Sequence, residues 1–123
     1  MIEAACGIMY NSEHKILMGK RCSKNKNYPN LWEFPGGKRE KNETIQECLK
    51  REWMEELNLN IEIEKQIHET VYDNKYYCYF FIGKIIDEEN MEKRDHDEIL
   101  FLHKDEIYKL DLFDGDDLVL DKL

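Results

Sequence analysis

Apolar residues near the start of the chain fall in short alternating runs, a pattern typical of β-strands. Ile2–Tyr10 is the first run, Asn11–Glu13 is a polar break, and His14–Lys20 is a second alternating run. Two such runs around a short break predict an antiparallel hairpin. Residues 21–30 are polar and carry several lysines, so we expect a basic loop there, followed by a short strand at Leu31–Phe34.

A long helix is predicted to open at Glu43-Thr44 and to run to about Leu57, because apolar residues recur there every three or four positions. On a helical wheel they form one stripe that should face the core: Ile45, Cys48, Leu49, Trp53 and Leu57. Asn58 follows directly, and asparagine is second only to glycine at the left-handed position that ends many helices. We therefore expect Asn58 to cap this helix.

The second half of the chain predicts three more strands and two helical segments. The strands are Ile61–Ile67, Val71–Ile86 and Glu98–His103, and the helical segments are Lys104–Leu110 and Asp114–Leu123. Strands on both sides of a long helix, with a further helix at the end, are typical of an α/β sandwich around a mixed sheet. A length of 123 residues is enough for one domain with its own core, so we expect residues 1–123 to form a single domain.

Composition argues against several classes of protein. Charged residues make up 37% of the chain, and no apolar run approaches the roughly 18 residues that a membrane-spanning helix needs. The net charge of −9 disfavours binding to bulk nucleic acid or to an anionic membrane. The four cysteines lie far apart and the first residues are not a basic leader, so we expect reduced thiols and a cytoplasmic protein.

The charge is distributed unevenly along the chain. Residues 1–41 carry a net charge of +4, whereas residues 42–123 carry −13. A basic part can hold an anion directly, and an acidic part can hold one through metal ions. The distribution therefore leaves room for a small anionic ligand, despite the acidic total.

The predicted helix carries acid on the side that should face the core. Glu52 and Glu56 fall inside the angular range of the apolar stripe, and Glu55 lies beside it. Several partly buried carboxylates are unfavourable unless they are neutralised, and Mg²⁺ accepts carboxylate oxygens while keeping waters for substrate phosphates. The wheel alone leaves two interpretations open: a divalent metal site, or a solvated acidic face paired with Lys50 and Arg51.

A glycine turn precedes the helix, and the two together form a spaced pattern. Pro35-Gly36-Gly37 lets the backbone approach a ligand closely. From Gly37 the chain reads G-x5-E-x7-R-E-x-x-E-E, defined by Gly37, Glu43, Arg51, Glu52, Glu55 and Glu56. This pattern resembles the box of the Nudix hydrolases, with Asn58 where the family has glycine. The segment before the box, the length and the C-terminal part are similar to MutT-type Nudix enzymes, so the resemblance covers nearly the whole chain.

The resemblance implies a Nudix-type α/β/α sandwich with a mixed β-sheet between helices. It also implies an enzyme that uses Mg²⁺, with Mn²⁺ as the alternative ion, to cleave a nucleoside triphosphate to a monophosphate and pyrophosphate. Oxidised nucleotides such as 8-oxo-dGTP are one substrate class. Alternatives within the family are hydrolysis of ADP-ribose, a dinucleoside polyphosphate, CTP or capped RNA. A module that senses a nucleotide without hydrolysing it is a further alternative, and we expect a monomer, with a dimer as the alternative.

Roles in catalysis follow from the same resemblance. The expected metal ligands are three glutamates and one backbone carbonyl: Glu52, Glu55, Glu56 and Gly36. Arg51 should orient the carboxylates by pairing with Glu43. The general base that takes the proton of the attacking water is either Glu52 or Glu98.

Substrate contacts are expected outside the box. The candidates are Arg21, Glu33, Phe34, Lys38, Asp116 and Asp117. Asp116 and Asp117 could accept hydrogen bonds from a base edge, and they also suit the acidic first turn of the last helix, with Asp114 or Asp116 as its cap. No role is predicted for the histidines, which are His14, His68, His96 and His103.

Overall fold

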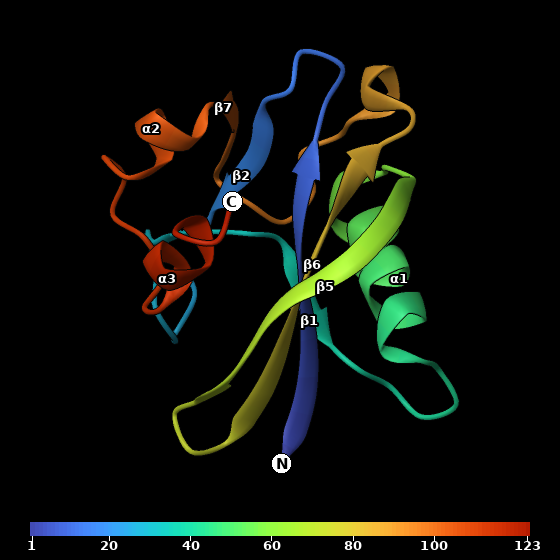
Figure 1. The fold of residues 1–123 in the computed structure, drawn as a ribbon. Helices are drawn as coiled ribbons and strands as arrows, with labels where there is room; N and C mark the ends of the chain where they lie inside the picture. The colour runs from blue at the N-terminus through green and yellow to red at the C-terminus, as the bar shows by residue number, and fades with distance from the viewer.

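The computed structural model describes residues 1–123 as a seven-stranded sheet flanked by helices (Figure 1). In chain order the elements are β1 (Ile2–Tyr10), β2 (Ile16–Lys20), β3 (Trp32–Glu33), β4 (Gly36–Lys38), α1 (Ile45–Leu57), β5 (Ile61–Tyr72), β6 (Tyr76–Ile85), a short 3₁₀ helix (Glu88–Asn90), β7 (Glu98–Leu102), α2 (Lys104–Ile107) and α3 (Asp116–Leu120). None of the helices is both long and apolar enough to cross a lipid bilayer.

The sheet is mixed, with the main strand order β3-β2-β1-β6-β5. β1 and β6 run parallel, from Ile2 opposite Tyr76 to Tyr10 opposite Lys84, and the other strand pairs are antiparallel. The other edge of β1 is shared, because β4 pairs with its first half and β2 pairs with its end. β7 extends the sheet beyond β2.

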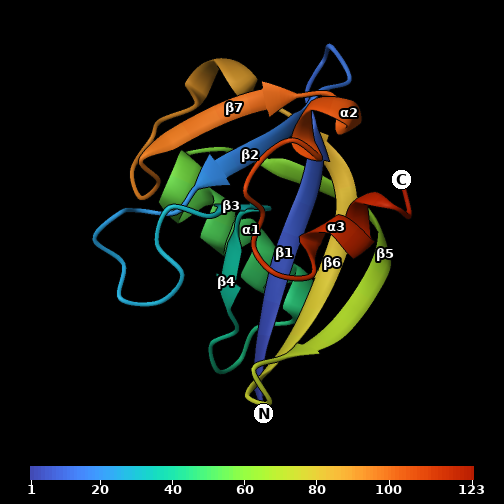
Figure 2. The ribbon, with the colours of Figure 1, turned by 90° about the vertical axis from the view of Figure 1, so that its left-hand side faces the viewer.

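Helices cover both faces of this sheet (Figures 1 and 2). One core lies under α1 and contains Ala5, Met9, Leu17, Cys48, Leu49, Trp53, Leu57, Leu59, Ile61, Phe81 and Ile85. The other core lies under α2 and α3 and contains Ile8, Ile16, Met18, Trp32, Phe34, Phe80, Ile107, Val119 and Leu120. Successive residues of β1 thus point to opposite cores, as the pleat of a strand requires. The predicted α/β/α sandwich around a mixed sheet is confirmed.

α1 begins and ends where its sequence predicts. The Thr44 hydroxyl accepts a hydrogen bond from the Glu47 amide (3.1 Å), and the Glu47 carboxylate accepts one from the Thr44 amide (2.7 Å), forming a capping box. Asn58 adopts the left-handed conformation (φ 56°, ψ 37°), and its amide donates to the Met54 carbonyl (3.0 Å). Asparagine tolerates this conformation, which explains why glycine is dispensable there.

The first hairpin is present, with a slightly later second strand than predicted. His14 has a positive φ of 60° and belongs to the turn, so β2 begins at Ile16. The side-chain oxygen of Asn11 accepts hydrogen bonds from the amides of Glu13 (3.1 Å) and Lys15 (2.9 Å). The turn is therefore built by Asn11, as expected of a residue that bonds its own downstream backbone.

The second hairpin turns later than the sequence pattern predicts. A break was expected between Ile67 and Val71, but β5 continues to Tyr72 and the turn lies at Asp73 and Asn74. Both turn residues have positive φ (58° and 53°), which short polar side chains tolerate. Two register shifts within β5 interrupt its alternation, which is why a single long strand is hard to read from sequence.

The glycine segment is a strand as well as a turn. Gly36–Lys38 forms β4, which pairs with Ala4–Cys6 of β1. A Cβ at Gly36 would lie 1.8 Å from the Ala5 carbonyl oxygen, so only glycine permits this approach. From the sequence alone, the two glycines predict a break in the strand. They form a strand in the fold because they pair with β1, which lies far away in the chain.

Both C-terminal helices are shorter than predicted. The N-cap of α3 is Gly115, with φ 92°, and no side chain caps this end. The expectation that Asp114 or Asp116 caps the helix is therefore wrong. Asp116 lies instead within the first turn, where it is only 4% exposed.

Candidate active site

β4 holds the backbone of its two glycines against β1 and α1. A Cβ at Gly37 would lie 2.3 Å from Cδ of Glu52 and 2.6 Å from each of its carboxylate oxygens. The Trp53 indole N–H donates to the Pro35 carbonyl (2.9 Å, buried), which fixes this segment to α1. The absence of side chains at β4 thus lets a carboxylate from α1 lie directly on the glycine backbone.

Arg51 ties the acidic helix to the glycine strand. Its Nε and Nη2 donate to the two oxygens of Glu43 (3.0 and 2.9 Å), so the predicted Arg51–Glu43 pair is present. Nη1 donates to Glu52 (3.0 Å) and Glu55 (3.2 Å), and Nη2 also donates to the Lys38 carbonyl (3.0 Å). Hydrogen bonds from Arg51, with one from the Glu40 amide, lower the pKa of Glu43 to about 2. Arg51 therefore orients the carboxylates of Glu43, Glu52 and Glu55.

Glu52 and Glu56 are the buried members of the acidic set. Burial, with the nearby negative charges of Glu33 and Glu52, raises the pKa of Glu56 to about 10. Burial also raises the pKa of Glu52, although Arg51 opposes this shift. The Oε2 atom of Glu56 is buried without a hydrogen-bond partner. Clustered carboxylates with an unpartnered buried oxygen need a neutralising proton or cation, so these residues fit a divalent metal ion.

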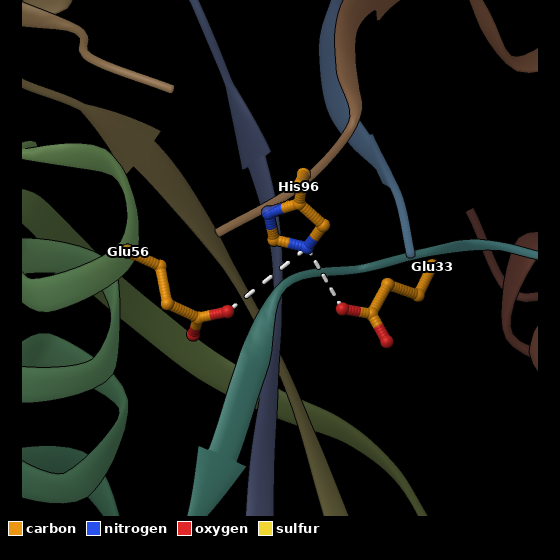
Figure 3. A group of neighbouring side chains, drawn as sticks. All are labelled: Glu33, Glu56 and His96. Atoms are coloured by element: carbon orange, nitrogen blue, oxygen red, sulfur yellow. Dashed lines mark hydrogen bonds and ion pairs between the residues drawn. The ribbon is translucent and has the colours of Figure 1, made fainter. Parts of the chain in front are cut away.

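Glu56 also belongs to a second group of side chains, with Glu33 of β3 and His96 of the loop before β7 (Figure 3). Nε2 of His96 lies 2.9 Å from Oε2 of Glu33 and 4.0 Å from Oε1 of Glu56. The His96 side chain is 1% exposed, and its Nδ1 has no hydrogen-bond partner. Figure 3 shows the imidazole between the two carboxylates, with Nε2 pointing to both.

A pocket of about 250 Å³ lies on the opposite face of β1 from α1. Ala4 and Cys6 line it, whereas the intervening Ala5 belongs to the core under α1. An aromatic wall closes one side of the pocket and consists of Tyr28, Tyr72 and Phe113. Their rings pack with centroids 4.8–5.5 Å apart, as aromatic clusters prefer. The pocket therefore offers both a flat apolar wall and the edge of the glycine strand.

The structure separates the two aspartates expected to contact substrate. Asp116 lines the pocket and is buried, and this burial raises its pKa well above the usual value, with Glu33 adding to the shift. Asp117 is exposed and does not line the pocket. Of the pair, only Asp116 is placed to face a ligand in this pocket.

The other predicted substrate contacts are brought to the same pocket. Arg21, Glu33, Phe34 and Lys38 all line it. Arg21 donates to Glu33 (2.8 Å) and to the carbonyls of Tyr28 and Asn27 (3.1 Å each), so it also organises the loop over the pocket. Lys38 is exposed, and its Nζ lies 5.6 Å from the centroid of the Tyr76 ring. It forms no ion pair, so no carboxylate neutralises its charge.

Glu98 lies apart from the acidic helix. It is exposed at the start of β7, opposite Lys20 of β2, and no hydrogen bond or ion pair links it to the carboxylates of α1. Two positions before it, His96 is the side chain that the structure brings to Glu56.

Sequence reasoning missed His96 and the aromatic wall. His96 contacts residues 63 and 40 positions away, so no local spacing could reveal it. The one feature of the sequence near His96 is the strand that begins two positions later at Glu98, and this is a weak signal for a functional histidine. Tyr28, Tyr72 and Phe113 come from three separate loops and strand ends, and nothing in their spacing predicts that they meet.

Comparison with known protein families decides the relationship that the box suggested. Residues 2–123 match the NUDIX domain. The chain belongs to the NUDIX domain family. The match covers β1 through α3, so the pocket and the acidic helix both lie within the family's domain.

Individual relatives agree with this assignment. The chain is 43% identical over 58 residues to an "8-oxo-dGTP diphosphatase" of Buchnera aphidicola subsp. Acyrthosiphon pisum, covering 45% of this chain and 47% of that protein. It is 33% identical over 60 residues to an "8-oxo-dGTP diphosphatase" of Proteus vulgaris, covering 49% and 53%. The chain thus spans about half the length of the curated relatives it matches. A MutT protein from Methanosarcina mazei Go1 has the same fold, with a TM-score of 0.82, 15% identity, and coverage of 98% of this chain and 90% of that one.

Proposed function

We propose that this NUDIX domain is a divalent-metal-dependent pyrophosphohydrolase that cleaves nucleoside triphosphates to a monophosphate and pyrophosphate. The proposal depends on the position of β4, which borders both the pocket and the acidic helix. Its residues line the pocket, and the side-chain-free backbone at Gly37 lies directly against the carboxylate of Glu52. A ligand in the pocket can therefore extend an anionic chain across β4 to the acidic helix.

The acidic helix α1 would provide most of the metal ligands and the general base of the proposed site. Glu52, Glu55, Glu56 and the Gly36 carbonyl would hold Mg²⁺ or Mn²⁺, which neutralises charge on the phosphates when bound. Arg51 keeps the carboxylates oriented through the hydrogen bonds described above. Glu52 is our candidate for the base that accepts the proton of the attacking water, because it is half-buried and burial raises its pKa.

The pocket would bind the base and sugar of the nucleotide. Burial raises the pKa of Asp116 and so favours its protonated form, which can donate one hydrogen bond while accepting another. That pattern suits a base edge that presents a carbonyl beside an N–H, as 8-oxoguanine does. Tyr28, Tyr72 and Phe113 offer faces and edges on which a base or sugar can pack. The names of the two curated relatives support 8-oxo-dGTP as the first substrate to test.

Product analysis across a nucleotide panel tests this proposal. The panel holds canonical dNTPs, 8-oxo-dGTP, CTP, ADP-ribose and a dinucleoside polyphosphate, with Mg²⁺, and pyrophosphate, phosphate and monophosphate are all measured. We expect pyrophosphate release from one triphosphate. Glu56→Gln should reduce this rate by at least about 100-fold, because it removes a charged ligand from the buried set.

Matched controls separate the possible outcomes. Glu64→Gln makes the same substitution at an exposed residue of β5 and should leave turnover unchanged. Asp116→Asn should change the ranking of bases more than the maximal rate. Turnover of ADP-ribose or a dinucleotide alone would contradict the triphosphate assignment but keep the chemistry. Nucleotide binding without any hydrolysis would instead identify a sensor.

We also propose that the domain works as a monomer in the cytoplasm, where nucleotide pools are found. The support is that the pocket and the acidic helix are built entirely from one chain. Sedimentation of the protein at working concentration, with and without nucleotide, tests the monomer. A stable dimer would contradict it.

A further inference from the structure

We propose that Glu33, Glu56 and His96 form a metal site with one nitrogen and two oxygen ligands, which prefers a transition metal ion such as Zn²⁺ or Co²⁺ to Mg²⁺. This ion would lie between β3, α1 and the loop before β7. The magnesium site of the proposed function is a different one, and the two sites share only Glu56.

The ligand atoms already lie close together. One donor atom from each of the three side chains lies within 4.8 Å of the other two. Zinc bonds of about 2.0–2.2 Å place neighbouring ligands of one ion roughly 3–4 Å apart. The 4.0 Å separation of His96 Nε2 from Glu56 Oε1 falls in that range, and the 2.9 Å separation from Glu33 Oε2 needs only a small opening.

His96 is held rigidly in this position. A Cβ at Gly19 would lie 2.5 Å from the imidazole ring, so the ring lies directly on the backbone of β2. The Arg94 amide donates to the Glu56 carbonyl (3.2 Å), and the Asp97 amide donates to the Lys20 carbonyl (2.9 Å). The His96 segment is thereby attached to α1 on one side and to β2 on the other. A prearranged ligand loses little conformational entropy when an ion binds.

A buried polar atom without a partner points to a missing ligand. Oε2 of Glu56 is inaccessible and makes no hydrogen bond. Glu56 is 9% exposed, and its carboxylate is directed toward the imidazole and Glu33 (Figure 3). A group of this kind is unlike an exposed acidic cluster, because buried polar atoms in proteins are nearly always satisfied.

The donor set argues for a transition metal ion. Imidazole suits Zn²⁺, Fe²⁺ and related ions, whereas Mg²⁺ takes oxygen ligands and keeps its waters. Arg21 occupies the other oxygen of Glu33 (2.8 Å), so Glu33 would bind through one atom only. An ion at this site would connect a residue of the pocket, Glu33, to the acidic helix through Glu56.

Nuclear magnetic resonance of the ¹⁵N-histidine-labelled protein tests the proposal directly. Zn²⁺ and Mg²⁺ are titrated separately, and the Nε2 resonance of His96 is assigned from its loss in His96→Gln. We expect one equivalent of Zn²⁺ to shift this resonance and Mg²⁺ to leave it unchanged. Calorimetry should show Zn²⁺ binding weakened by at least about tenfold in His96→Gln, with Mg²⁺ binding changed less than about twofold.

Carboxylate variants provide the matched controls. Glu33→Gln should abolish the Zn²⁺-induced shift, whereas Glu55→Gln, at an exposed position of the same helix, should preserve it. An unmoved His96 resonance in the wild-type protein would overturn the proposal, and so would a shift that survives Glu33→Gln. Because the wild-type spectrum alone decides the first point, misfolding of a variant does not hide the answer. Nucleotide hydrolysis is measured independently, so failure of the proposed function is distinguishable from failure of this site.

Discussion

The glutamates of α1 are neighbours in sequence but meet different environments. The side chain of Glu55 is 58% exposed, whereas those of Glu52 and Glu56 are 17% and 11% exposed. Arg51 contacts Glu52 and Glu55, whereas Nε2 of His96 lies 4.0 Å from Oε1 of Glu56. Because burial raises the pKa of a carboxyl, Glu52 and Glu56 are the members that most need a cation or a proton.

Placement of Glu52 and Glu98 predicts which of them acts as base. Glu52→Gln should lower kcat by about 10²–10⁴-fold, the range for loss of a general base. Glu98→Gln should lower it by less than about tenfold, because Glu98 is exposed and contacts none of the α1 carboxylates. Single-turnover rates at saturating nucleotide measure both effects. The opposite ranking would assign the proton transfer to Glu98.

β4 can contact its neighbours closely because two of its three residues are glycines. It is three residues long, yet it pairs with β1, borders the pocket and lies against α1. Each glycine faces a different neighbour, since successive positions of a strand point to opposite faces. Gly36 faces the backbone of β1, and Gly37 faces the side chain of Glu52.

Alanine at these two positions should therefore have different consequences. Gly36→Ala forces a methyl group against the Ala5 carbonyl, which cannot move without breaking β1–β4 pairing. We expect a loss of about 2–3 kcal/mol in unfolding free energy. Gly37→Ala meets a flexible side chain, so stability should fall by less than about 1 kcal/mol while activity falls about 100-fold. Thermal unfolding and steady-state rates, with Lys41→Ala as an exposed control, distinguish the two. Equal losses of stability would contradict this account.

In the whole molecule, the sheet lies between the acidic helix and the pocket. α1 covers one face, the pocket opens on the other, and β4 at the edge of β1 connects them. Two acidic side chains are buried beside this sheet, with Glu56 9% exposed and Asp116 4% exposed. Burial raises the pKa of both Glu56 and Asp116. In the metal-free protein, ionisation of Glu56 or Asp116 at high pH should therefore destabilise the folded state.

The contribution of Asp116 to the stability of the metal-free protein should fall as pH rises. The folded state holds the Asp116 proton above the usual aspartate pKa, so unfolding releases this proton and a higher pH favours unfolding. Asp116→Asn removes this dependence, and it should gain stability relative to wild type as the pH rises above about 4, the usual aspartate pKa, by at most about 1.4 kcal/mol per pH unit. Urea unfolding in a chelator measures the difference. A constant difference across this range would show that Asp116 is not protonated in the fold.

Much of the fold could be predicted from sequence because its signals are local. The α1 stripe, the capping box and the cap at Asn58 depend on residues within a few positions of each other. The long β5 strand and the β4 strand could not be predicted in full. β5 is interrupted by register shifts, and β4 is extended only because β1 lies beside it.

The candidate site divides in the same way. The spaced pattern from Gly37 to Glu56 is visible in the sequence alone, and its resemblance to the Nudix box predicted the pairing of Arg51 with Glu43. The folded chain was needed to show that Asp116 lines the pocket while Asp117 faces solvent, and that His96 lies between Glu33 and Glu56. These residues are far apart in the chain, and their elements meet only when the sheet brings its strands, loops and helices together.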